Sequence, residues 1–148
     1  MFRGVATVNL DSKSRLVVPA RYRDALLASA GGRVVVTADP TRCLLLYPLP
    51  AWEPVEQRLN GLSDFDPRTR SLKQLMVGYA HDMEMDSAGR VLLPAMLKKF
   101  AGLDKGVVLV GQGGKIELWD ESRWDEKIGE VTGFGDGALP PELEGFTL

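Results

Sequence analysis

The sequence has one cysteine, one histidine and no long apolar run, and each of these scarcities excludes a class of protein. Cys43 cannot form an internal disulfide, which favours a reducing compartment, and we interpret it as a small apolar residue. Neither Cys43 nor His81 has partners at metal-ligand spacing, so we expect no metal site and no cofactor. The apolar stretches fall short of the roughly 18 residues of a membrane span, so we expect a cytoplasmic protein without membrane contact.

Catalytic motifs are also scarce. The sequence contains neither a Walker glycine loop nor a serine elbow, and His81 has no partner set. The Asp-Ser pairs at residues 11–12 and 86–87 resemble the loops of aspartic proteases, whose carboxylates share a proton. Those loops continue with glycine, whereas Lys13 and Ala88 follow here. We therefore expect no catalytic residues and no enzyme.

What the sequence does contain is one motif written twice. Residues 10–20 read LDSKSRLVVPA, and residues 85–95 read MDSAGRVLLPA. Asp, Ser, Arg, Pro and Ala occupy the same places in both copies, and the core positions exchange one aliphatic residue for another. Such a repeat predicts a chain built from two copies of one unit.

The two copies lie within the same predicted order of elements: hairpin, helix, hairpin, helix. Apolar alternation, β-branched residues and turn residues predict the strands and hairpins. In the first half the predicted segments are a hairpin of strands 5–10 and 15–18 around the turn 11–14, a helix over 20–29, strands over 34–38 and 43–47, and a helix over 51–59. The second half is predicted to repeat them, with strands over 80–85, 90–93, 107–110 and 116–119, a helix over 95–101, and a further helix around Trp124.

A unit of four short strands has exposed edges and little core, so two units are expected to combine. We predict an α+β fold in which two pseudo-symmetric hairpin–helix units interleave into one small β-barrel with peripheral helices. The predicted divisions are a first half over residues 1–59, a connecting helix within 60–79, a second half over 80–130, and a poorly ordered acidic tail over 131–148.

Charge is unevenly distributed along the chain, although the net charge is only −2. Residues 1–80 contain eleven Lys/Arg and seven Asp/Glu, whereas residues 81–148 contain seven and thirteen. The first part can attract a polyanion despite the acidic total, because the local field governs such attraction. The alternative is that the asymmetry reflects only solvated surfaces.

The motif arginines, Arg15 and Arg90, each follow an aspartate by four positions. One interpretation is a local ion pair with Asp11 or Asp86 that fixes the turn. The other is a guanidinium presented on a rigid hairpin, where arginine contacts guanine edges and phosphates. Further cations lie near the first motif and suit phosphate contacts: Lys13, Arg3, Arg21 and Arg23.

The two turns differ at the residue before the arginine. Gly89 adopts positive φ freely and closes a short turn without strain. Ser14 stands at the equivalent place in the first copy, where positive φ would cost roughly 1–2 kcal/mol. The first turn is therefore expected either to carry strain or to have another geometry.

Three features together resemble the MraZ family of bacterial transcriptional regulators, within the AbrB-like, swapped-hairpin superfamily. They are the opening Met-Phe-Arg-Gly, the LDxKxRxxxP pattern of residues 10–19 followed by Arg23, and the DxxGRxxxP pattern of residues 86–94. The resemblance covers roughly residues 1–130 and implies two tandem SpoVT-AbrB-type domains.

The resemblance implies a sequence-specific regulator that binds direct repeats in promoter DNA and represses its own division and cell-wall operon. It also implies a homo-oligomer, a ring of about eight subunits, associated with the nucleoid. The DNA-contacting role transfers to Arg15 and Arg90, with Lys13 at the family's basic turn position. We expect residues 11–19 to read DNA and residues 86–94 to complete the barrel.

The superfamily also includes antitoxins that hold a toxin through a C-terminal tail. Residues 133–148 could serve in this way, so a protein-interaction module is the alternative. Against it, antitoxins carry one short hairpin unit rather than a fused pair.

Overall fold

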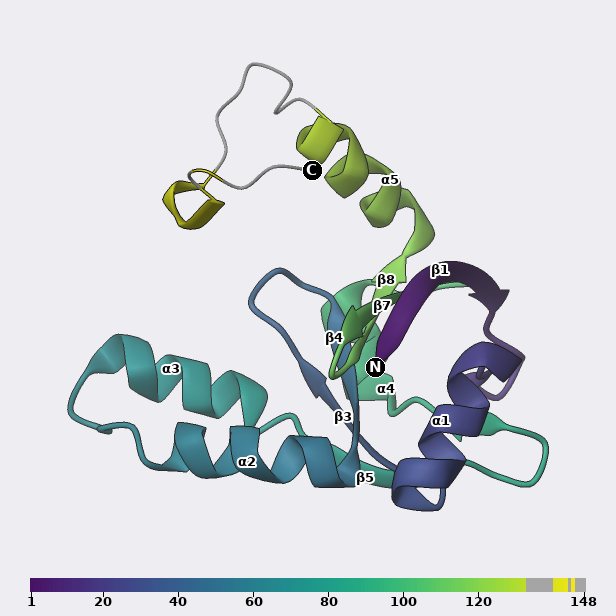
Figure 1. The fold of residues 1–148 in the computed structure, drawn as a ribbon, viewed down its shortest axis with the longest axis horizontal. Helices are drawn as coiled ribbons and strands as arrows, with labels where there is room; N and C mark the ends of the chain where they lie inside the picture. The colour runs from purple at the N-terminus through teal and green to yellow at the C-terminus, as the bar shows by residue number, and fades with distance from the viewer. Residues whose placement is uncertain (133–139, 144, 146–148) are drawn as a thin grey trace.

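The structure, a computed structural model, describes residues 1–132, 140–143 and 145, and has the predicted α+β class (Figure 1). Its elements are β1 (Phe2–Asn9), β2 (Arg15–Val17), α1 (Ala20–Ala30), β3 (Arg33–Ala38), β4 (Leu44–Pro48), α2 (Leu49–Asn60), α3 (Pro67–Met76), β5 (His81–Glu84), β6 (Arg90–Leu92), α4 (Ala95–Ala101), β7 (Gly106–Gly113), β8 (Ile116–Asp120), α5 (Glu121–Thr132) and a 3-10 turn (Pro141–Leu143). Most of the tail predicted over 131–148, and of the segment 133–148 considered for toxin binding, lies outside the described residues.

The strands form a six-stranded antiparallel sheet, in the order β1-β7-β8-β4-β3-β5, and a separate two-stranded ribbon of β2 and β6. Four of the six ladders join an early strand to a late one: β1 with β7, β3 with β5, β4 with β8, and β2 with β6. Only β3–β4 and β7–β8 are pairs of neighbours in the sequence. The two parts of the chain are therefore interleaved, as predicted.

The hairpin predicted for each motif is wrong. The strands predicted over 5–10 and 15–18 are present with shifted bounds, as β1 (Phe2–Asn9) and β2 (Arg15–Val17), but β1 pairs with β7 while β2 pairs with β6. Two backbone hydrogen bonds close each turn. Asp11 N donates to Arg15 O and Asp86 N to Arg90 O, both at 2.9 Å, while Ser14 N donates to Asp11 O at 3.1 Å and Gly89 N to Asp86 O at 2.9 Å. The return strands are only three residues long, and pairing with each other lets both bury their central residue in a shared core.

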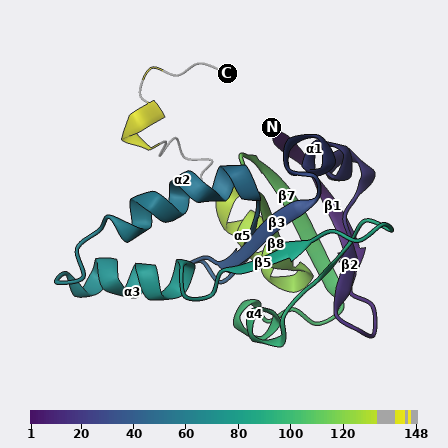
Figure 2. The same cartoon turned by 90° about the horizontal axis from the view of Figure 1, so that it is seen from below.

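The predicted barrel is not closed by ladders among the described residues, because β1 and β5 are the edges of the sheet. The ribbon of β2 and β6 is connected to both edge strands through the two motif turns. Figure 2 shows α1 and α4 on opposite sides of the strands, while α2 and α3 project together at the other end of the molecule.

Helices α1 and α4 begin and end in the same way, which is why the sequence predicts them well. Each follows a proline, which cannot donate to a ladder but fits a helix start. Each ends at a glycine in the left-handed region, Gly31 at φ 61° and Gly102 at φ 63°. The helix predicted over residues 95–101 is confirmed with the same bounds, and α1 extends one residue beyond its prediction.

Two apolar clusters hold the elements together. The first lies beneath the ribbon and contains its central residues, Leu16 and Val91, both fully buried. The second packs α2 and neighbouring elements on the sheet around Trp52 and Trp119. Cys43 lies in this second cluster, where burial raises the pKa of its thiol to about 12, as expected for an apolar packing residue. Among the described helices, none is long and apolar enough to cross a membrane.

Candidate nucleic-acid interface

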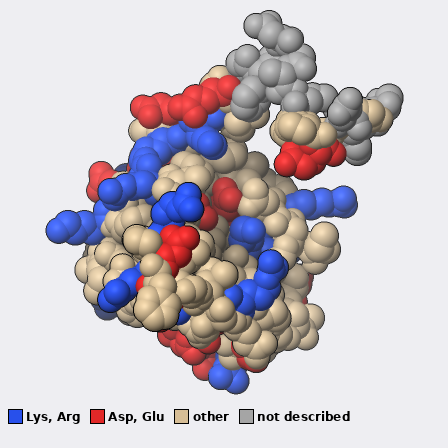
Figure 3. All heavy atoms as spheres, turned by 90° about the vertical axis from the view of Figure 1, so that its left-hand side faces the viewer, with Lys and Arg blue, Asp and Glu red and all other residues tan. Residues whose placement is uncertain are grey.

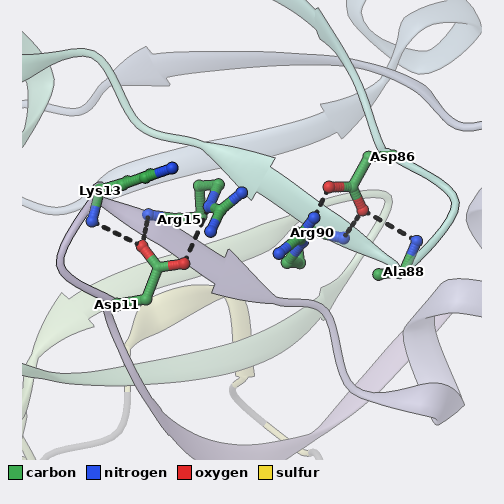
Figure 4. Close-up of polar contacts among 6 residues, drawn as sticks. All are labelled: Asp11, Lys13, Arg15, Asp86, Ala88 and Arg90. Atoms are coloured by element: carbon green, nitrogen blue, oxygen red, sulfur yellow. Dashed lines mark hydrogen bonds and ion pairs between the residues drawn. The ribbon is translucent and has the colours of Figure 1, made fainter.

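Each motif turn is built around an aspartate that accepts three hydrogen bonds (Figure 4). Oδ1 of Asp11 accepts from the backbone N–H of Lys13 and of Arg15, both at 2.9 Å, and Oδ2 accepts from Arg15 Nε at 2.8 Å. Asp86 does the same with Ala88 N at 3.0 Å and with N and Nε of Arg90, both at 2.8 Å. The local ion pair is therefore present in both copies.

These hydrogen bonds stabilise the ionised form of both carboxyl groups. The backbone N–H of Arg15, with the other donors of its turn, holds the pKa of Asp11 below its ordinary value of 3.8. The backbone N–H of Arg90 has the same effect on the pKa of Asp86. The two turns are thus electrostatically alike at their centres.

The ribbon register places both motif arginines on one face. Arg15 lies opposite Leu92, and Val17 lies opposite Arg90, while Leu16 and Val91 face the core. The outer ribbon face therefore consists of Arg15, Val17, Arg90 and Leu92, with the two arginines on a diagonal. Val17 and Leu92 are 46% and 57% exposed.

The ion pairs leave part of each guanidinium available. Within each guanidinium only Nε contacts the aspartate. Among the described residues, the terminal nitrogens of Arg15 and Arg90 donate no hydrogen bond to the protein. The two arginine side chains are 29% and 34% exposed. The ion pair uses only Nε of each side chain, so it does not preclude the nucleic-acid contact that the sequence offers as its alternative.

Of the two alternatives predicted for the first turn, strain or a different geometry, the structure has the strained turn. Ser14 has φ 63°, close to the φ 76° of Gly89, although a side chain at this conformation costs roughly 1–2 kcal/mol. Lys98 of α4 donates from Nζ to Ser14 Oγ at 2.7 Å. The sequence did not predict Lys98 as a site residue. Lys98 nevertheless aligns with Arg23 when the sequences of the two motifs are aligned.

Arg23 is directed at the protein rather than outward. Its Nη2 and Nε donate to the carbonyl of Val18 at 3.0 and 3.3 Å. The guanidinium covers Gly89, and a Cβ built on that glycine would overlap Arg23 Nε. This predicted DNA-binding residue therefore supports the second turn in the structure.

Arg3 and Arg21 lie together at a second place. Arg3 is at the end of β1 remote from the turn, roughly 25 Å along the strand from Asp11 at ~3.3 Å per residue. Arg21, in the first turn of α1, and Arg3 line an open cavity of about 560 Å³. Tyr22 donates from its hydroxyl to the carbonyl of Gly4 beside this cavity. Apart from Arg23, the predicted cations thus divide into two groups: Lys13, Arg15 and Arg90 at the motif turns, and Arg3 and Arg21 at this cavity.

The described residues also bear on metal binding. Across residues 1–132, 140–143 and 145, no three His, Cys, Asp or Glu side chains are grouped as metal ligands would be. The single histidine, His81, places Nδ1 2.9 Å from the carbonyl oxygen of Tyr79.

Comparisons with known proteins identify relatives over the full chain. The sequence profile of the family described as "MraZ protein, putative antitoxin-like" matches residues 1–75 and again residues 76–132. The protein named "Transcriptional regulator MraZ" of Thiobacillus denitrificans is 74% identical over 148 residues, covering 100% of both chains. The proteins of the same name from Nitrosomonas eutropha and Shewanella oneidensis are 58% and 51% identical. The alignment with the Nitrosomonas eutropha protein covers 100% of both chains. The alignment with the Shewanella oneidensis protein covers 88% of this chain and 86% of the relative.

Proposed function

Because the chain belongs to the MraZ family, we propose that it is a sequence-specific, DNA-binding transcriptional regulator. Its target on this proposal is a set of direct repeats in the promoter of its own division and cell-wall operon, which it represses at the nucleoid. We take residues 1–59 and 80–130 as two SpoVT-AbrB-type units, connected by 60–79 and completed as a barrel by the ribbon. The observation that carries the proposal is the outer ribbon face.

This face suits base recognition in the major groove. The groove admits a two-stranded β-ribbon, and an arginine can bind guanine O6 and N7 through two donors. Arg15 and Arg90 are held rigidly by Asp11 and Asp86 through Nε, which leaves their terminal nitrogens for such contacts. The exposed Val17 and Leu92 lie beside them and can contact thymine methyl groups.

Phosphate contacts supply most of the affinity of such proteins and fix their orientation. Lys13 is exposed at the first turn and contributes only its backbone N–H to the turn. Its ammonium group is therefore available to contact a phosphate. We assign Arg3 and Arg21 to phosphates beyond the ribbon. Arg23 acts through the carbonyl of Val18 and the second turn.

We further propose that copies of the chain assemble, as in a ring of about eight subunits. Phe65, in the connection between α2 and α3, is 99% exposed (Figure 3 shows this end, with charges of both signs). Near it along the chain, Val55, Arg58, Leu59 and Leu62 line a mostly apolar cavity of about 210 Å³. An apolar cavity of about 150 Å³ binds benzene, so a second copy's phenyl ring can fit. Because one chain carries both the exposed phenyl ring and the cavity that fits it, its copies can join head to tail. A ring of such copies binds DNA more tightly than one copy does, because several weak contacts act together.

A mobility-shift titration tests the DNA-binding proposal. The probe is a labelled duplex from the region directly upstream of the chain's own gene. Arg15→Ala should weaken binding by about 5- to 150-fold, the effect of losing one two-donor base contact of ~1–3 kcal/mol. Arg68→Ala on α3 is the matched control, since it removes the same charge from a 93% exposed side chain.

Wild-type binding should also fall steeply as salt is added, because bound phosphates release counterions. Equal affinity of Arg15→Ala and wild type for this duplex would refute the assigned interface. Native mass spectrometry of Phe65→Ser tests assembly separately, and undiminished oligomers would refute the contact through Phe65.

A further inference from the structure

Both motif turns are covered by a basic side chain from the helix that follows the other motif. Arg23 of α1, after the first motif, covers Gly89 in the second turn. Lys98 of α4, after the second motif, binds Ser14 in the first turn. Arg23 and Lys98 occupy equivalent places, each three residues after the alanine that begins its helix. The chain therefore carries two crossed pairs, arginine with glycine and lysine with serine.

The chemistry of each pair is complementary. The guanidinium of Arg23 lies where a Cβ of residue 89 would be, so this cover requires glycine. Ser14 has a side chain at the corresponding place, and the slimmer ammonium of Lys98 accommodates it and donates to its hydroxyl at 2.7 Å. Exchange of only one member of a pair would leave either an overlap or an unsupported turn.

Ser14 belongs to the turn that orients the Arg15 side chain. Its backbone N–H donates to Asp11 O at 3.1 Å, and its carbonyl accepts from Leu93 N at 2.9 Å. The next residue is Arg15, whose own N–H and Nε bind the Asp11 carboxylate. Any shift of the Ser14 backbone from φ 63° would move the guanidinium.

We propose that Lys98 is a positioning residue for DNA recognition: by holding Ser14 in the left-handed conformation it fixes the direction of Arg15. The inference rests on the proposed function. Lys98 then acts through the turn, without contacting the nucleic acid. Ser14→Gly makes the turn independent of Lys98, because glycine adopts positive φ without a supporting side chain.

A double-mutant cycle on the upstream duplex tests this. Lys98→Ala should weaken binding by about tenfold, as loss of a hydrogen bond from a charged donor does, with an unchanged slope of affinity against salt. In the Ser14→Gly background, Lys98→Ala should change affinity less than about twofold. Lys99→Ala, which removes the neighbouring exposed charge on the same helix, is the control.

The exchange of pairs provides a second variant. Lys98→Arg alone should impair binding, since the larger group meets Ser14, and Lys98→Arg combined with Ser14→Gly should restore it. An equal loss from Lys98→Ala in both backgrounds, with a reduced salt slope, would overturn the inference in favour of a direct phosphate contact. No loss from Lys98→Ala would overturn it as well.

A measurement without DNA separates this inference from the proposed function. The Nε–H resonance of Arg15, observed by NMR, should shift or broaden in Lys98→Ala and return in Lys98→Ala with Ser14→Gly. If Arg15→Ala binds the duplex as wild type does, the proposed function fails, while the resonance still reports on the positioning. An unchanged Arg15 resonance in Lys98→Ala would overturn the positioning itself.

Discussion

The two motif turns share the hydrogen bonds that shape them and differ in what covers them. Asp11 and Asp86 accept the same three bonds from equivalent donors. The first turn reaches its left-handed residue with Ser14 and Lys98, and the second reaches it with Gly89 and Arg23. One backbone geometry thus has two side-chain solutions, and each needs its partner from the opposite part of the chain.

The two copies also differ in charge, so they need not perform the same task. The ribbon combines both motifs into one element, with Arg15 and Arg90 on a single face. The first turn adds Lys13, where the second has Ala88. On the proposed function, equal geometry with unequal charge favours the first copy for DNA contact.

The largest effect should come from breaking the element that the copies share. Leu16→Ala should lower the free energy of unfolding by about 2–5 kcal/mol, because it opens a cavity at a fully buried site. Its cross-strand partner Val91 belongs to the other motif, so the whole chain should still unfold in one transition. Urea denaturation followed by tryptophan fluorescence and far-UV circular dichroism should give coincident curves.

Val17→Ala is the control for that experiment, because Val17 is on the outer ribbon face and 46% exposed. It should change the free energy of unfolding by less than about 1 kcal/mol. Two separate transitions in Leu16→Ala would show that the motifs are stabilised independently.

Local sequence signals predict most of the helices and strands of this fold, but they do not predict which strands pair with each other. The proline before α1 and the glycine after it define that helix from neighbouring residues alone, and the same holds for α4. Strand β2 alternates in the same way whichever strand it pairs with, so its sequence favours the nearby β1 as readily as the distant β6. The interleaving was predictable from the need for a shared core, but the ladders were not.

The candidate site divides in the same manner. The Asp11–Arg15 pair follows from a spacing of four residues and was predictable. The contact of Lys98 with Ser14 joins residues 84 positions apart, and its one sequence signal is the alignment of Lys98 with Arg23. The direction of Arg23 toward Val18 depends on Gly89 of the other motif, which no local pattern encodes.

The next effect distinguishes the copies in DNA binding. Arg90→Ala should weaken binding to the upstream duplex less than Arg15→Ala does, with the latter losing ~1–3 kcal/mol. The reason is that Arg15 has Lys13 beside it to hold phosphate, whereas Ala88 beside Arg90 cannot. Competition mobility shifts with both variants measure the difference.

Ala88→Lys sharpens this test by giving the second turn the first turn's cation. It should strengthen binding and increase the loss caused by Arg90→Ala. Equal losses from Arg15→Ala and Arg90→Ala in the unmodified chain would instead assign DNA contact to both copies alike.

A smaller effect concerns the left-handed residues. Gly89→Ala should destabilise the fold by at least about 1–2 kcal/mol, because it places a side chain at φ 76° and displaces Arg23. Ser14→Gly should leave the free energy of unfolding within about 1 kcal/mol, since relief of strain offsets the lost bond to Lys98. Urea midpoints at unchanged slope report both values. Equal destabilisation by the two changes would contradict the different covers.

The smallest effect should be equal in the two copies. Asp11 and Asp86 have pKa values below 3.8 in the fold because backbone and side-chain donors bind their ionised forms. The unfolded chain therefore binds these protons more tightly, so their contribution to stability is present above pH 3.8 and is lost as pH falls through the lower folded values. Asp11→Asn and Asp86→Asn should each flatten the acid side of the stability profile by the same amount. Asp64, whose pKa Lys73 lowers, gives a background common to both variants. Because the three bonds to each aspartate match, a flattening confined to one variant would show that the turns differ at their centres as well as in their covers.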